Sequence, residues 1–338
     1  MTSKERCLAA IAGRPVDRVP VFPLLMFLSA DRAGITYREF ASDGASLARA
    51  QLLMRERFGI DAISACSDAF RVSGDLGGEM IFPADRPPYL ARPIVRDESD
   101  LPRIGRPDPT RPGSRMADRC NAVSIMSKAA GRDCLVLGWV DMPFAEACSI
   151  CGVSEFMLML ADRPKLAHAV LDRLADVVVD FAVAQVNAGA AMIGAGDAAA
   201  SLISPAMYRE FALPREQRVC EAVHDAAGLV KLHICGNTSA LIPDMIRSGA
   251  DLFNVDHMVD FVQARDAYSA AGRCFKGNIN PVDLLTLRPD AVSRHARELI
   301  ELAAGTRYML SAGCEIPAAV PDEVFAAFCG APKEGRRI

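Results

Sequence analysis

The stretch Leu229–Gly236, LVKLHICG, has the pattern of a buried strand that runs into a tight turn. An apolar run is followed by His233, Cys235 and a Gly-Asn pair, and alternation along a strand points His233 and Cys235 to the same side. A distant stretch, Leu310–Pro317 (LSAGCEIP), repeats this order and places Cys314 where its strand ends. One imidazole and two thiolates are three ligands of the kind that Zn²⁺ prefers, with a fourth position left open for a reactant.

Short apolar segments of the same kind recur along the chain and alternate with helical patterns such as Pro164–Asn187 and Pro289–Ala304. This alternation predicts a parallel sheet covered by helices. Eight strands close a (β/α)8 TIM barrel, which we expect as a single α/β domain over residues 1–338. A doubly wound open sheet is the alternative, and it is disfavoured because no Gly-rich dinucleotide turn follows any strand. The eight predicted strands are Val19–Leu24, Ala62–Ser64, Leu135–Trp139, Ala191–Gly194, Leu229–Ile234, Leu252–Val255, Cys274–Lys276 and Tyr308–Ser311.

Residues 74–119 interrupt this order, because they are rich in Pro, Asp and Arg and show little periodicity. We expect an N-terminal excursion over the surface, which is either an ordinary insertion or a lid.

Composition excludes several classes of function. A net charge of −4 over 338 residues, without a Lys/Arg cluster, argues against nucleic-acid binding. No apolar run approaches the roughly 18 residues of a membrane span, and the N-terminus lacks the apolar core of a signal peptide, so we expect a cytoplasmic protein without a membrane partner. Eleven scattered cysteines then indicate reduced thiols, and the Cys148-Cys151 pair is interpreted as packing. Homodimer formation stays open.

Polar residues gather at the C-terminal ends of the predicted strands, which is the face that carries the active site in barrels of this kind. Turn chemistry accounts for some Asp and Asn there, but not for a His with two Cys. We therefore predict His233, Cys235 and Cys314 as metal ligands. His257 is interpreted as a surface or packing residue, and Glu315 is disfavoured as a fourth ligand because strand neighbours face opposite ways. The remaining strand-end residues, candidates for catalysis or substrate orientation, are Asp68, Asp197, Asp256 and Asn278.

Five motifs together resemble the uroporphyrinogen decarboxylase superfamily over nearly the whole chain. More closely, the chain resembles its zinc-dependent cobalamin methyltransferase branch, which includes methylcobalamin:coenzyme M methyltransferases. The family fold is a TIM barrel, in agreement with the strand pattern. The motifs are His233-Ile-Cys-Gly-Asn, Gly313-Cys-Glu-Ile-Pro, Gly249-Ala-Asp-Leu-Phe-Asn-Val-Asp256, Gly277-Asn-Ile-Asn-Pro281 and Ser204-Pro-Ala-Met-Tyr-Arg-Glu-Phe211.

Two departures separate the chain from the decarboxylase itself. Where that enzyme has an Arg-rich segment suited to the carboxylates of a porphyrinogen, this chain has Leu24–Ala30, LLMFLSA, without arginine. Cys314 stands where the decarboxylase has a His, and it would supply the third zinc ligand of the methyltransferases. Asp68 matches the catalytic aspartate of the decarboxylase, so a metal-free decarboxylase remains the alternative.

The resemblance implies methyl transfer that involves cobalamin carried by a separate small corrinoid protein. A small-molecule donor or acceptor, such as a thiol held as thiolate on zinc, would be the other substrate, and the direction of transfer stays open. Trp139 and Met142 are expected to line the barrel mouth toward the cobalamin, with Met26, Phe27 and Phe144 nearby; ordinary core packing is the competing interpretation. A non-catalytic binding barrel is a third possibility.

Overall fold

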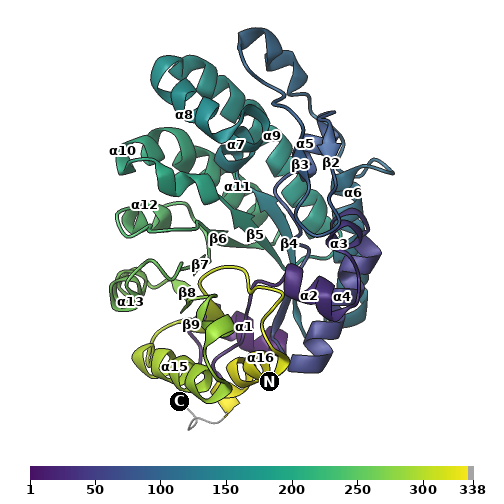
Figure 1. Cartoon of the computed structure of the whole chain (residues 1–338). Helices are drawn as coiled ribbons and strands as arrows, with labels where there is room; N and C mark the ends of the chain where they lie inside the picture. The colour runs from purple at the N-terminus through teal and green to yellow at the C-terminus, as the bar shows by residue number, and fades with distance from the viewer. Residues whose placement is uncertain (334–338) are drawn as a thin grey trace.

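A curled parallel sheet organises the chain in the computed structural model, which describes residues 1–333 (Figure 1). All neighbouring strands of this seven-stranded sheet are parallel. The α/β barrel predicted from the strand pattern is confirmed. In spatial order the strands are β1 (Ala62–Ser64), β4 (Leu135–Asp141), β5 (Met192–Gly196), β6 (Leu229–His233), β7 (Leu252–Asn254), β8 (Cys274–Ile279) and β9 (Tyr308–Ala312).

The eighth predicted strand, Val19–Leu24, does not form a ladder. It makes two isolated bridges, Val21 to Leu310 and Leu24 to Glu315. Pro20 and Pro23 bracket the segment, and a residue without an N–H cannot extend a ladder. The segment still lies between the first and last strands, because Phe22 N donates to Leu310 O at 2.9 Å and Asp61 N donates to Val21 O at 2.8 Å. It therefore fills the place of the missing strand.

Helices surround the sheet, as Figure 1 shows. The yellow end of the chain lies beside the purple beginning, where α16 packs against α4. The longer helices are α1 (Ser3–Ile11), α4 (Gly44–Phe58), α6 (Arg115–Ala130), α7 (Pro143–Cys151), α8 (Val153–Asp162), α9 (Pro164–Asn187), α11 (Leu213–Asp225), α13 (Phe261–Ala270), α15 (Pro289–Leu302) and α16 (Asp322–Gly330). The shorter ones are α2 (Phe27–Arg32), α3 (Tyr37–Ser42), α5 (Arg71–Asp75), α10 (Pro205–Met207), α12 (Ile242–Ile246) and α14 (Asp283–Thr286).

The segment 74–119 has some regular structure of its own. A two-stranded antiparallel ribbon joins β2 (Met80–Ile81) to β3 (Tyr89–Leu90), and a 3₁₀ helix follows at Glu98–Arg103. The last residues of the predicted excursion already belong to α6, which begins at Arg115 with Ser114 as its N-cap. No single helix among residues 1–333 is long and apolar enough to cross a membrane; only α7 and α8 taken together pass that test, and they are bent by 108°.

Side-chain alternation builds the barrel interior in layers. Leu137, Met192, Leu252 and Met309 belong to one apolar cluster in the lower part of the barrel. Two residues further along each strand, the same face carries a polar layer. Its members include Lys231, Asn254, Lys276 and Ser311, all of them buried. The layer above it contains the strand-end residues of the site.

Candidate metal centre

His233, Cys235 and Cys314 come together at the C-terminal end of the barrel. His233 Nε2 lies 3.1 Å from Cys235 Sγ and 3.5 Å from Cys314 Sγ, and the two sulfur atoms are 3.6 Å apart. A tetrahedral ion with Zn–S bonds of about 2.3 Å separates its ligand atoms by roughly 3.5–3.8 Å. The three donors therefore fit a zinc ion, apart from a small adjustment of the His233–Cys235 pair.

The two thiols titrate as a pair. The hydrogen bond between Cys235 and Cys314, helped by His233, lowers the pKa of Cys314 to about 3. The same hydrogen bond, together with burial, raises the pKa of Cys235 far above its usual value. The pair thus shares a proton between its two sulfurs, and a metal ion that bound both sulfurs would displace that proton.

Loops after neighbouring strands hold the ligand-bearing segments in place. Asp256 Oδ2 accepts from Gly236 N at 3.0 Å, which fixes the turn after Cys235. Asn254 Nδ2 donates to Gly313 O at 3.0 Å, beside Cys314. A Cβ on Gly313 would lie 2.4 Å from His257 N, so the close approach of these two loops requires glycine. Asp256 thus lies next to the three donors and holds the backbone after Cys235 in place.

Asn278 and His257 belong to this same support. Asn278 Nδ2 donates to Asp256 O at 3.2 Å and to Val259 O at 2.8 Å, so it anchors the loop after β7. His257 is exposed at the surface, as the sequence indicated, and its Nδ1 lies 2.9 Å from Asp256 Oδ1. The strand ends before His257, and the chain turns it back toward the carboxylate.

Glu315 lies outside the group of three donors, as expected. Its Oε1 accepts from Phe27 N at 2.7 Å, at the start of α2. Burial raises its pKa to about 8, so the carboxyl group is protonated at neutral pH.

Asp68 is held by an arginine on α6. Arg115 contacts its two oxygens at 3.0 and 2.9 Å, and Ser67 Oγ donates to it at 2.7 Å. Burial alone would raise the pKa of Asp68, but the guanidinium groups of Arg115 and Arg71 outweigh that effect and hold the pKa well below its usual value. Asp68 is therefore a fixed negative charge at the end of β1.

Asp197 is fully buried and faces a second carboxyl group rather than the three donors. Its Oδ1 accepts from Ala145 N at 2.8 Å. Burial and the neighbouring Glu216 raise its pKa far above the usual value, and burial raises the pKa of Glu216 to about 7. Tyr208 donates its hydroxyl to Glu216.

Trp139 and Met142, both expected at the barrel mouth, lie in different apolar clusters. Trp139 belongs to a small cluster with Leu24 and Cys66, against which Met26 packs. Met142 instead lies in the main hydrophobic core with no exposed surface, because it directly precedes α7 and turns toward the helices. The packing alternative describes Met142 correctly.

Charged residues missed in the sequence lie inside the barrel and at its mouth. Lys231 precedes His233 by two residues on β6. The one sequence signal for its burial is its position within an otherwise apolar strand. Arg71 Nη2 donates to Asp141 Oδ2 at 2.5 Å, and burial raises the pKa of Asp141 to about 6.

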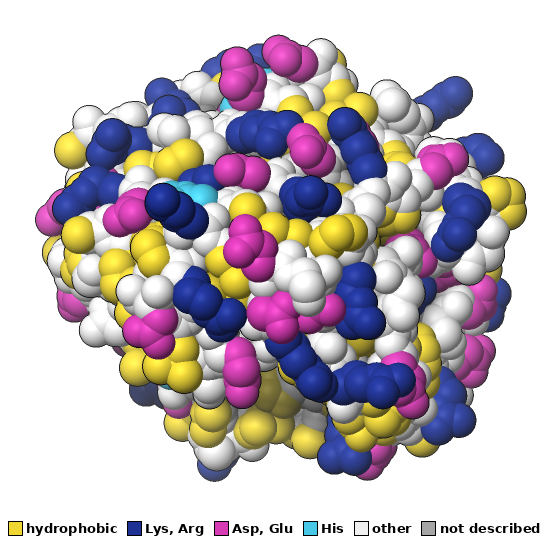
Figure 2. Space-filling view, turned by 90° about the horizontal axis from the view of Figure 1, so that it is seen from above, with side chains coloured by type: hydrophobic (Ala, Val, Ile, Leu, Met, Phe, Trp, Pro, Cys, Tyr) yellow, Lys and Arg dark blue, Asp and Glu magenta, His cyan; other side chains and the backbone are white. Residues whose placement is uncertain are grey.

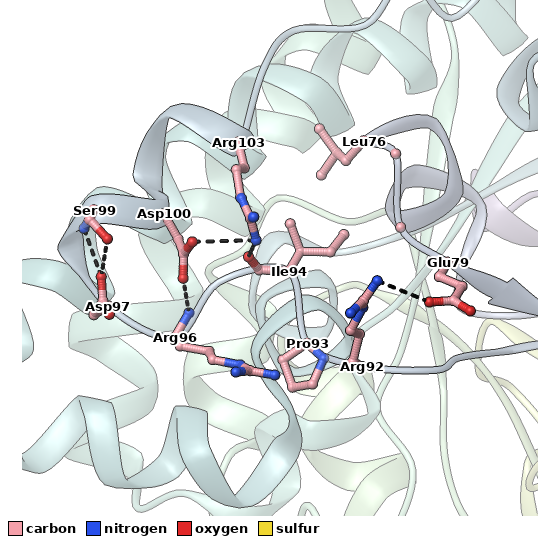
Figure 3. A pocket seen from close by; sticks show the side chains of 12 residues that line it. Leu76, Glu79, Arg92, Pro93, Ile94, Arg96, Asp97, Ser99, Asp100 and Arg103 are labelled. Atoms are coloured by element: carbon pink, nitrogen blue, oxygen red, sulfur yellow. Dashed lines mark hydrogen bonds and ion pairs between the residues drawn. The ribbon is translucent and has the colours of Figure 1, made fainter.

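A cavity of about 620 Å³ lies away from the three donors and is lined by residues of the excursion itself (Figure 3). Its charged side chains pair with one another, for instance Arg92 with Glu79 and Arg103 with Asp100. The face of the molecule in Figure 2 carries acidic and basic side chains interspersed, without a large area of one sign.

The profile of the Uroporphyrinogen decarboxylase (URO-D) family matches residues 2–335. The chain belongs to the uroporphyrinogen decarboxylase family. Within that family, a uroporphyrinogen decarboxylase from Xanthomonas euvesicatoria is 30% identical over 327 residues, covering 90% of this chain and 89% of the relative.

Two methyltransferases are similar over an even larger part of the chain. The methylcobamide:CoM methyltransferase MtbA of Methanosarcina acetivorans is 26% identical over 328 residues, covering 95% of this chain and 94% of the relative. The solved structure of a methyltransferase from Methanosarcina mazei superimposes with a TM-score of 0.89 at 26% identity, covering 99% of both chains.

Proposed function

We propose that this protein is a methyltransferase that moves a methyl group between a corrinoid carried by a partner protein and a small molecule such as a thiol. The observation that carries the proposal is the convergence of His233, Cys235 and Cys314 from two separate strands. Similarity to MtbA and to the Methanosarcina mazei methyltransferase supports it. The direction of transfer is left open.

The three donors would hold the metal, and Zn²⁺ there would supply a Lewis acid that keeps a thiol as thiolate at neutral pH. The protein's own residues prepare that position. The hydrogen bond between Cys235 and Cys314, with His233 beside it, favours a thiolate in the pair. Asp256 and Asn254 fix the backbone of the two ligand-bearing loops through the bonds to Gly236 and Gly313.

A decarboxylase remains the second candidate because of the relatives that carry that name and because Asp68 lies at the end of β1. Two observations favour methyl transfer over it. Asp68 is neutralised by Arg115 at 2.9 Å. The segment Leu24–Ala30 offers no arginine to a polycarboxylate substrate.

The partner is proposed to dock on the barrel end that carries the donors. Exposed apolar side chains follow three strands there, which suits a transient protein interface. Leu202 after β5 is 65% exposed, Met258 after β7 is 58% exposed and Val282 after β8 is 54% exposed.

Metal analysis tests the proposal. We expect about one zinc per chain in protein purified without chelators, and a large loss of zinc in Cys314→Ser. Cys120→Ser is the matched control, because Cys120 lies on α6 outside the group of three. Methyl transfer from methylcobalamin to a panel of thiols should follow the zinc content. A protein that takes up no zinc and decarboxylates uroporphyrinogen would reverse the assignment.

A further inference from the structure

Asp141 lies in the same row of the barrel as His233, two strands away. In the register of the sheet, Asp141 of β4 pairs with Gly196 of β5, and Gly196 pairs with His233 of β6. Residues in register on parallel strands point to the same face of a sheet, so both side chains are on the barrel interior. Neighbouring strands are about 4.8 Å apart, which separates the two backbones by roughly 10 Å. A short molecule held at the three donors can therefore reach Asp141.

Gly196 leaves the space between these two side chains open. A Cβ at this position would lie 3.0 Å from Asp141 Oδ1 and 3.3 Å from Trp139 Cζ2. The Asp141 carboxylate thus extends over the glycine, on the side of β6. Any larger residue in place of Gly196 would fill the path between the carboxylate and the three donors.

Arg71 fixes the orientation of this carboxylate. Its Nη2 donates to Asp141 Oδ2 at 2.5 Å, which leaves Oδ1 over the gap. The Arg71 side chain is 1% exposed and that of Asp141 is 12% exposed, so the carboxylate is the part of the pair that a ligand can contact. A carboxylate oxygen can accept two hydrogen bonds, so Oδ1 can accept from a ligand even beside the indole N–H of Trp139.

Charges of both signs surround Asp141, so the sign of a ligand's charge does not decide whether it binds. Arg71 balances Asp141, and Arg115 balances Asp68. The Lys231 ammonium lies 4.3 Å from the centroid of the nearby indole. Hydrogen-bond chemistry is more selective, because an ionised carboxylate only accepts, and a second acceptor placed against it has no proton to share.

We propose that Asp141 is a specificity-determining residue that selects small molecules with a hydroxyl or ammonium head group. The head group donates to Asp141 Oδ1 across Gly196, while the other end of the molecule is held at the three donors. This inference rests on the proposed function for that other end. It names the class of substrate: a small thiol that ends in a hydroxyl or an amine, rather than in a carboxylate or an alkyl group.

Four thiols that share a two-carbon spacer test this: 2-mercaptoethanol (hydroxyl), cysteamine (ammonium), 3-mercaptopropionate (carboxylate) and 1-propanethiol (methyl). In zinc-loaded wild type, calorimetric titration should give the first two dissociation constants about tenfold below the others, the effect of one hydrogen bond to a charged acceptor. In Asp141→Ala the four values should converge. Asp141→Asn keeps an acceptor without the charge, so it should retain the preference for the hydroxyl and lose most of that for the ammonium.

The emission of Trp139 reports where the thiols bind, because this sole tryptophan borders the same gap. The hydroxyl and ammonium thiols should shift it in the wild type and not in Asp141→Ala. If that variant does not fold, Gly196→Ala leaves the ion pair with Arg71 in place and should remove the preference by filling the gap. Asp290→Asn is the control, because Asp290 is exposed at the start of α15.

The outcomes separate this inference from the proposed function. Zinc-loaded wild type that binds the four thiols equally, or a preference that survives in both Asp141→Ala and Gly196→Ala, would overturn the role of Asp141 and leave the metal centre standing. Wild type that takes up no zinc but still prefers the hydroxyl and ammonium thiols would keep the role of Asp141 and overturn the proposed function. Wild type that binds neither zinc nor any of the thiols would overturn both.

Discussion

At the scale of single residues, the ion pair between Asp68 and Arg115 ties the end of β1 to α6. The Asp68 side chain is fully buried, and Arg115 reaches both of its oxygens. Removing one partner of a buried pair leaves the other charge uncompensated, which commonly costs several kcal/mol. The pair therefore anchors the excursion to the barrel whether or not Asp68 takes part in chemistry.

Asp68→Asn should lower the free energy of unfolding at pH 7 by about 3 kcal/mol. Because the folded-state pKa of Asp68 is lowered, its contribution is present above the unfolded pKa of about 4 and is lost as pH falls through the folded value. Urea unfolding of both proteins at pH 7 and pH 3 measures this. Equal stability at pH 7 would mean that the pair contributes nothing, while unchanged zinc content would confirm that the metal centre is independent of it.

The carboxyl pair of Asp197 and Glu216 gives the opposite pH dependence. Both folded-state pKa values are raised, so the folded protein binds more protons than the unfolded chain and stability falls as pH rises from about 4.5 to 7. Glu216→Gln, which can still accept from Tyr208, should be more stable than the wild type at pH 8 by about 2 kcal/mol and should differ little at pH 5. Thermal unfolding at the two pH values measures the difference, and parallel profiles would contradict shared protonation.

At the scale of elements, the β4–β5–β6 register decides what the barrel interior holds. Gly194 has no side chain, Trp139 fills the space over β5, and Lys231 meets the ring from the far side. Three strands thus cooperate in placing one charge.

Gly194→Ala should push the indole out of this place. The new Cβ would overlap Trp139 at 2.4 Å, and overpacking of this kind costs roughly 1–3 kcal/mol. Since Trp139 is the sole tryptophan of the chain, fluorescence reports on it directly, and we expect a shifted emission maximum and a lower melting temperature. Gly105→Ala is the control, because nothing lies within 4 Å of its Cβ. An unchanged spectrum in Gly194→Ala would show that the ring does not depend on this glycine.

Local patterns in the sequence predicted most of these elements but not their cross-strand partners. The strand ends at His233 and Cys314 were readable because apolar runs stop there at a glycine. The loss of the Val19–Leu24 ladder follows from its prolines, while its place in the barrel depends on distant β9. The sequence did not reveal three charged residues of the interior: Lys231, Arg71 and Glu216, the neighbour of Asp197. Strand register and helix packing, rather than local patterns, bring them there. The roles of the site residues remain predictions.

At the scale of the whole molecule, the two ends of the barrel differ. The exposed apolar residues Leu202 and Val282 follow strands at the barrel end that carries the donors. Leu302, which is also exposed, is the last residue of α15 and lies toward the opposite end. Exposed apolar residues at the donor end are consistent with a partner protein that docks on this end of the barrel.

Leu202→Glu and Val282→Glu should each slow methyl transfer with a corrinoid protein by about tenfold, since a buried charge at an interface removes roughly 1–2 kcal/mol of binding. Transfer with free methylcobalamin should not change. Leu302→Glu is the matched control at the other end. Steady-state rates with both methyl carriers measure the effect, and equal losses with both would place these residues outside the interface.

The closure of the barrel also has a consequence for how the protein is made. The segment around Val21 meets its partner Leu310 only when nearly the whole chain has left the ribosome. Contacts between such distant residues form late, because a long loop must close first. An apolar edge therefore stays unpaired through most of translation, and the nascent chain should depend on chaperones until its last strand emerges.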